Sequence, residues 1–208
     1  MDTPKPRLPL SLAAFVVLYM LAFGVVALVQ RNAEFVIYEG SMIVFIAVVL
    51  VLHRTVVFRA STLWMLAFWG FFHLAGGTVP IPADLAQTDA THTVLYSLRP
   101  WADLPRYDQV THAFGFFSAT LACHDAIVAF AGRPNPAPKM LAVAAALMGM
   151  GLGAINEVLE FAVQLTLPET NVGGYVNTGW DLVSNTIGAI AAATARIIAP
   201  PAPTSAAP

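Results

Sequence analysis

Charged residues are scarce in this chain. Lys, Arg, Asp and Glu make up 11% of the 208 residues, against about 25% in a typical soluble domain. Hydrophobic residues make up 58%, and the mean hydropathy is +0.71. This composition excludes a soluble enzyme with one apolar patch, so we expect an integral protein of the lipid bilayer. The net charge of −2 gives no reason to expect a nucleic-acid partner, and we expect none.

Cysteine is also nearly absent, since Cys123 is the only one, and an intrachain disulfide is therefore excluded. The chain has no phosphate-binding glycine loop, nucleophile elbow, HExxH or CxxC motif. No reaction can be named from a motif. The substrate, the pathway and the oligomeric state stay open at this stage.

Long apolar runs dominate what is present. A membrane-spanning helix needs about 20 mainly apolar residues, and six segments come near this length, the second and third being short. The expected spans are 9–29, 35–52, 60–76, 108–131, 138–166 and 177–199. We therefore predict an all-α polytopic bundle of about six transmembrane helices, forming one domain over 9–199. Residues 1–8 are expected to be a cytoplasmic tail, and 200–208, rich in Pro and Ala, a disordered one.

The basic residues predict the orientation of these spans, because cytoplasmic loops of membrane proteins are enriched in Lys and Arg. With six spans, both termini share one side with the second and fourth loops. The basic residues on that side are Lys5, Arg7, Arg54, Arg59, Arg133, Lys139 and Arg196. The basic residues on the other side are Arg31, Arg99 and Arg106. We therefore expect both termini in the cytoplasm.

Polar side chains recur near the non-cytoplasmic ends of four spans. Ionisable groups inside a span cost a few kcal/mol on insertion scales, so each is a candidate functional residue. Three pairs are spaced three or four apart, which places the members of each pair on one helical face. The polar residues at this depth are His73, Asp108, His112, Glu157, Glu160, Asp181 and Asn185.

Carboxylate and imidazole groups from facing helices are how helical bundles build metal sites. This donor set suits a divalent cation such as Zn, Mn or Fe. The expected metal ligands are His73, Asp108, His112 and Asp181. The expected catalytic bases are Glu157 and Glu160, with Asn185 and Trp180 lining the same pocket. Two alternatives stay open, namely a hydrogen-bonded network that only holds the helices together and a proton relay in a transporter.

Two further features have structural interpretations. Gly149 and Gly153 form a GxxxG motif, which favours close helix packing either within the chain or between copies. His124 and Asp125 adjoin Cys123 near the cytoplasmic end of the fourth span. We interpret them as an interfacial pair, with a second site as the alternative.

Four motifs together resemble a known family. They are FFHLAGG at 71–77, PRYDQVTHAFGF at 105–116, INEVLEF at 155–161 and NTGWDLVSNTIGA at 177–189. They resemble the YjdF-type bacterial inner-membrane proteins, distant relatives of the VanZ-like group. The resemblance covers about 35–195 and implies a multi-pass protein of the bacterial inner membrane. The motif residues of the family correspond in this chain to His73, Asp108, His112, Glu157, Glu160, Trp180 and Asp181.

One departure from the family pattern bears on the site. Asn177 and Asn185 stand where family members tend to have acids, which leaves fewer anionic ligands. The resemblance supports the fold and the site and supplies no reaction. Our first hypothesis is a metal-dependent hydrolase or transferase acting on a lipid or lipid-linked substrate. The alternatives are a small proton-coupled transporter and a structural or accessory subunit without catalysis.

Overall fold

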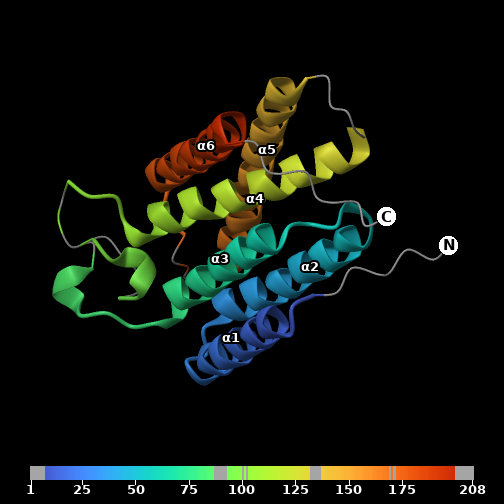
Figure 1. Ribbon diagram of the computed structural model, residues 1–208. Coiled ribbons are helices and arrows are strands. Elements are labelled where there is room, and N and C mark those ends of the chain that lie inside the picture. The colour runs from blue at the N-terminus through green and yellow to red at the C-terminus, as the bar shows by residue number, and fades with distance from the viewer. Residues whose placement is uncertain are drawn as a thin grey trace.

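The computed structural model describes residues 8–86, 93–99, 101, 103–131, 137–168, 170 and 172–199. These residues contain six α-helices and two short 3-10 helices (Figure 1). The α-helices are α1 (Leu10–Val29), α2 (Ala33–Val56), α3 (Ala60–Thr78), α4 (Tyr107–Ala131), α5 (Pro138–Thr166) and α6 (Tyr175–Ile198). The 3-10 helices η1 (Ala83–Leu85) and η2 (Leu95–Ser97) lie between α3 and α4. The tails expected at 1–8 and 200–208 lie outside the described residues, apart from Leu8.

The helix ends follow from local chemistry. The Asn32 side chain accepts a hydrogen bond from the Phe35 amide and so caps the start of α2. Pro138 opens α5, where its missing N–H leaves no donor unsatisfied. The prediction of a short second segment was wrong, because α2 has 24 residues and is about 36 Å long at 1.5 Å per residue. The helix ends at Val56, and the next residue, Val57, has a left-handed backbone conformation (φ 52°).

The surface of the bundle is apolar over most of its length, as a lipid environment requires. Large hydrophobic side chains such as Leu18, Val51, Leu147 and Ile190 are exposed. By length and composition, α1, α2, α4 and α5 are apolar enough to cross a membrane. Among the described helices, α3 and α6 fall outside this set; α6 does so because its buried face carries polar residues. The all-α, polytopic membrane fold predicted from the sequence is confirmed.

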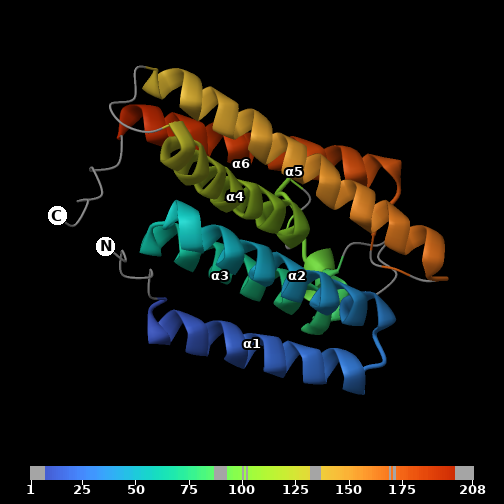
Figure 2. The ribbon, with the colours of Figure 1, turned by 90° about the vertical axis from the view of Figure 1, so that its right-hand side faces the viewer.

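The helices are stacked in an order that places α4 near the centre. Figures 1 and 2 both show α1 at one edge, α2 and α3 next, then α4, with α5 and α6 on the far side. Small residues let α4, α5 and α6 approach closely, and Ala145, Ala189 and Ala192 have no exposed surface. Gly188 on α6 lies directly against the backbone carbonyl of Ala113 on α4.

The GxxxG motif serves this packing within the chain. Gly149 faces Thr120 on α4, and Gly153 faces Asn185 on α6. A Cβ added at Gly153 would lie 3.0 Å from the Cβ and Nδ2 atoms of Asn185. The two glycines therefore bring α5 close to the polar residues of α6.

Helices consecutive in the chain run in opposite directions, so each end of the bundle gathers three helix starts and three helix ends. The Gln30 and Asn32 side chains donate to the carbonyls of Thr78 (3.0 Å) and Gly77 (3.2 Å). These bonds join the turn between α1 and α2 to the end of α3. We call this end, where α4 and α6 begin and α5 finishes, the polar end.

The opposite end is held together by Asp125 of α4. Its carboxylate accepts from the guanidinium groups of Arg59 (2.6 Å) and Arg196 (3.2 Å) and from the Thr62 hydroxyl (2.8 Å). The Asp125 side chain is only 5% exposed. The interpretation of Asp125 as an interfacial partner of His124 was therefore wrong. It is a buried ion-pair residue that ties α4 to α3 and α6.

Candidate functional site

The centre of the polar end is the imidazole of His112, which is buried on α4. Its Nε2 lies 3.5 Å from a carboxylate oxygen of Asp108 and 3.7 Å from one of Glu160. Its Nδ1 lies 3.5 Å from Glu157 and 3.0 Å from the side-chain oxygen of Asn185. One ring therefore contacts side chains from α4, α5 and α6. The spacing of four between Asp108 and His112, and of three between the glutamates, puts each pair on the face that meets this ring.

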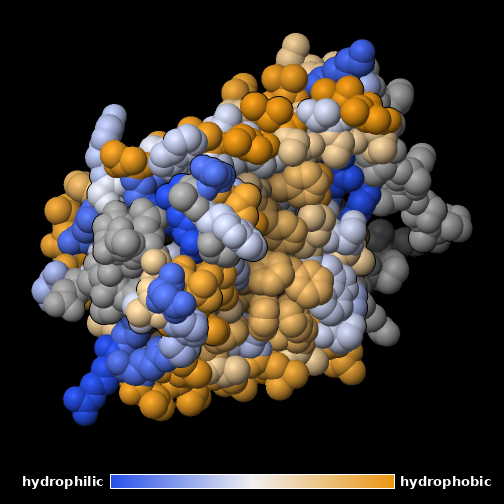
Figure 3. Space-filling view, turned by 90° about the vertical axis from the view of Figure 1, so that its left-hand side faces the viewer, coloured by the Kyte–Doolittle hydropathy of each residue, from blue (hydrophilic) through white to orange (hydrophobic). Residues whose placement is uncertain are grey.

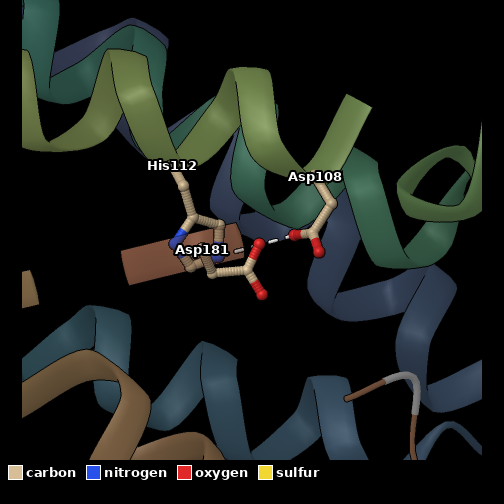
Figure 4. Close-up of side chains that lie close together, drawn as sticks. All are labelled: Asp108, His112 and Asp181. Carbon is tan, nitrogen blue, oxygen red and sulfur yellow. Dashed lines mark ion pairs between the residues drawn. The ribbon is translucent and has the colours of Figure 1, made fainter. Parts of the chain in front are cut away.

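Asp181 of α6 completes the group. It has no exposed surface, and Figure 4 shows its carboxylate directed towards Asp108 and beside the His112 ring. Potential ligand atoms of Asp108, His112 and Asp181 all lie within 4.8 Å of one another. The same holds for His112, Glu157 and Glu160. We call the set Asp108, His112, Glu157, Glu160, Asp181 and Asn185 the His112 cluster.

Asn177 holds two of these carboxylates from the first turn of α6. Its Nδ2 donates to Asp181 at 2.5 Å and makes a longer contact of 3.5 Å with Asp108. The amide therefore links two acids without supplying charge.

Two further amides hold the glutamates of α5. Asn156 donates to Glu160 (2.8 Å), and Asn185 donates to Glu157 (3.2 Å). The sequence analysis missed Asn156, although its position four residues before Glu160 is the spacing that places both on one helical face.

Some buried oxygens of the cluster lack a partner. Among the described residues, Oδ1 of Asp181 and Oε2 of Glu157 accept no hydrogen bond. Leaving such an acceptor unsatisfied costs about 1–3 kcal/mol. One imidazolium also cannot neutralise four carboxylates, so the cluster must hold protons or a further cation.

His73 is not a member of either group of potential metal ligands found among the described residues. Its Nδ1 pairs with the hydroxyl of Tyr96, 2.5 Å away in η2. Burial and the negative charge of Asp108 raise the pKa of Tyr96 well above its usual range, so the hydroxyl stays protonated and can donate to a neutral imidazole. The close approach depends on Gly76, where a Cβ would meet the Tyr96 ring. Tyr96 carries no sequence signal, because it lies in a loop without periodicity.

Two hollows adjoin the His112 cluster. The first, the loop-side cavity, has a volume of about 720 Å³ and is lined by Asp108, Trp180 and Arg106 among others. The second, the α2–α5 groove, has a volume of about 260 Å³ and is lined by His73 and Glu160 together with apolar side chains. Figure 3 shows that hydrophilic side chains gather on part of the face that it draws and hydrophobic ones cover much of the rest.

Fold and site together define an all-helical, multi-pass membrane protein with a buried cluster of carboxylates around one histidine. The sequence matches the model of a family described as predicted membrane protein (DUF2238) over residues 11–200, and the chain belongs to that family. This is the YjdF-type family, so the resemblance inferred from the four motifs is confirmed. No curated protein and no solved structure matches the chain.

Proposed function

We propose that this protein is a metal-dependent hydrolase or transferase acting on a lipid or lipid-linked substrate at the non-cytoplasmic face of the bacterial inner membrane. In this proposal all six helices cross the bilayer, both termini are cytoplasmic, and the polar end faces outward. The observation that carries the proposal is the set of ligand atoms of Asp108, His112 and Asp181 within 4.8 Å of one another. Asp181 belongs to this set, and the Oδ1 of its fully buried carboxylate has no hydrogen-bond partner among the described residues.

The chemistry of the donor set agrees with a divalent transition metal. Two carboxylates and one imidazole favour Zn, Mn or Fe over Ca or Mg. A cation bound there would lower the pKa of a coordinated water and so supply a nucleophile near neutral pH. Asn177 donates to both carboxylates and fixes their orientation, as residues around metal ligands commonly do.

The two glutamates of α5 have separate places in this proposal. Glu160 lines the α2–α5 groove and contacts His112, so it can meet both a substrate in the groove and the cation site. It is the better candidate for the general base. Glu157 is buried, bonded by Asn185, and supports His112 from the other ring nitrogen. His73, expected from the sequence to be a metal ligand, is proposed instead to line the α2–α5 groove.

Elemental analysis of detergent-purified protein tests the metal. We expect a near-stoichiometric transition metal in the wild type and its loss in His112→Ala and in Asp181→Asn. Glu39→Gln is the matched control, because Glu39 is an acid of α2 outside the His112 cluster. Absence of metal in the wild type after incubation with Zn, Mn and Fe would overturn the metal site.

Proton-coupled transport is the second candidate, and one observation favours it. The His112 cluster adjoins the loop-side cavity at the polar end, while the ion pairs of Asp125 join the helices at the opposite end. A site open towards one face is what one state of an alternating-access cycle requires. This candidate predicts substrate flux in proteoliposomes that is lost in Asp108→Asn. A purely structural cluster predicts instead that Glu157→Gln lowers thermal stability with no ligand-dependent effect.

A further inference from the structure

The two hollows beside the His112 cluster differ in chemistry. The α2–α5 groove opens on the flank of the bundle, since Ile37, Phe45 and Leu159 line it and are themselves partly exposed. These residues belong to α2 and α5, two helices apolar enough to span a membrane. The mouth of the groove is therefore bordered by surface that contacts lipid chains.

The loop-side cavity lies at the end of the bundle and has a polar wall. Arg99 and Arg106 both line it, together with the acids Asp103 and Asp108 and the amides Gln109 and Asn177. Arginine binds phosphate through paired hydrogen bonds, and basic pockets beside transmembrane helices bind anionic headgroups. Trp180 also lines the cavity and is exposed, as expected for a tryptophan near the membrane interface.

One residue in the wall of each hollow contacts the same imidazole. Asp108 lines the loop-side cavity and Glu160 lines the groove, and each contacts Nε2 of His112, at 3.5 and 3.7 Å. A ligand with one part in each hollow would therefore contact Asp108 and Glu160, and both of these residues contact the His112 ring. An amphiphile has the matching division into an apolar and a polar part.

We propose that the substrate is an anionic phospholipid of the surrounding leaflet, with one acyl chain in the α2–α5 groove and its phosphate headgroup in the loop-side cavity. The proposal rests on the proposed function and names the substrate class of the same site. At about 30 Å³ per water-sized group, the groove volume of about 260 Å³ holds about nine such groups. The groove can therefore hold part of one acyl chain but not two acyl chains.

Photolabelling in nanodiscs tests whether the acyl chain binds in the α2–α5 groove. The probe is phosphatidylglycerol with a diazirine in one chain, and the labelled peptides are mapped by mass spectrometry. We expect labels to concentrate on the groove residues of α2 and α5, and to be lost in Ala162→Trp, which fills the groove. Ala154→Trp is the matched control, because Ala154 is an exposed alanine of the same helix outside the groove lining. Labels spread evenly around the bundle, or equal loss in both variants, would overturn the proposal.

Competition experiments test the headgroup. Unlabelled phosphatidylglycerol is expected to compete better than phosphatidylcholine. In Arg106→Gln this preference is expected to fall about tenfold, the effect of losing one charge-assisted hydrogen bond. Arg31→Gln is the control, because Arg31 is an exposed arginine at the same end of the bundle. Competition by inorganic phosphate as strong as by the lipid would show a free-anion site and overturn the lipid assignment.

Metal content measured on the same samples separates this inference from the proposed function. Bound metal with unspecific labelling would reject the lipid seat and leave the metal site standing. Specific labelling of wild-type protein that takes up no metal after incubation with Zn, Mn and Fe would support the lipid-binding site and reject the metal site.

Discussion

Removal of the Asp125 carboxylate is expected to destabilise the bundle strongly while leaving the His112 cluster chemically intact. Asp125 joins three helices at the end opposite to the cluster, through contacts of 2.6 Å with Arg59 and 3.2 Å with Arg196. Asp125→Ala would leave two guanidinium groups facing each other without their shared counter-charge. The three side chains are 5%, 19% and 12% exposed, so solvent screens this loss only weakly.

The size of the effect follows from the cost of leaving one side of a buried ion pair uncompensated, about 3–5 kcal/mol. For a chain of about this length, 1 kcal/mol corresponds to roughly 2–4 °C in Tm, so we expect a fall of roughly 6–20 °C. The assay is a thermal ramp of detergent-purified protein followed by size-exclusion chromatography. Asp103→Ala is the control, because Asp103 is an exposed acid in the loop.

A double substitution sharpens the test. In Asp125→Ala with Arg196→Ala, the loss of Tm should be smaller than the sum of the two single losses, because each removes the same ion pair. The metal content per folded molecule should match the wild type. The reasoning is refuted if Asp125→Ala has the same Tm as the Asp103→Ala control. It is also refuted if Asp125→Ala loses bound metal at an unchanged Tm, because that result would indicate a second metal site at Asp125.

Two other substitutions probe the packing and the loop. Gly188→Ala should destabilise the protein by about 1–3 kcal/mol, because its Cβ would meet the Ala113 carbonyl. A Cβ at Gly179 would have no neighbouring atom within 4 Å. Gly179→Ala is therefore the control and should have a Tm equal to or above that of the wild type in the same thermal ramp. Tyr96→Phe removes the hydroxyl that pairs with His73 and should cost about 1–3 kcal/mol, measured by the same ramp. An unchanged Tm in Tyr96→Phe would show that this pair is not formed.

The sequence was sufficient for the helices because their determinants are local. The α5 range was predicted as 138–166 and found as Pro138–Thr166, since a proline opens a long apolar run. The other helix ends differ from the predicted ranges by at most four residues. Local spacing also predicted which polar residues share a face, as with Asp108 and His112.

The partners of polar groups across helices could not be predicted in this way. Asp125 lies 66 residues from Arg59 and 71 from Arg196, and no periodicity connects positions so far apart. Tyr96 reaches His73 from a loop. Helix periodicity specifies the face on which a residue lies, whereas the pairing of faces depends on how α3, α4 and α6 pack.

That packing also links the small residues of α5 to the chemistry of the site. Asn185 contacts both His112 and Glu157, and a Cβ at Gly153 would come within 3.0 Å of it. Gly153→Ala must therefore displace the Asn185 side chain by a few tenths of an ångström or part α5 from α6, and either shift loosens the support of His112.

We expect metal affinity in Gly153→Ala to fall by about 10–100-fold, measured by equilibrium titration of the purified protein with Zn or Mn. Gly151→Ala, two residues away, meets nothing within 4 Å and should bind as the wild type does. Equal affinity in both variants would show that the position of Asn185 does not govern the site, and would shift the role of the GxxxG motif to helix packing alone.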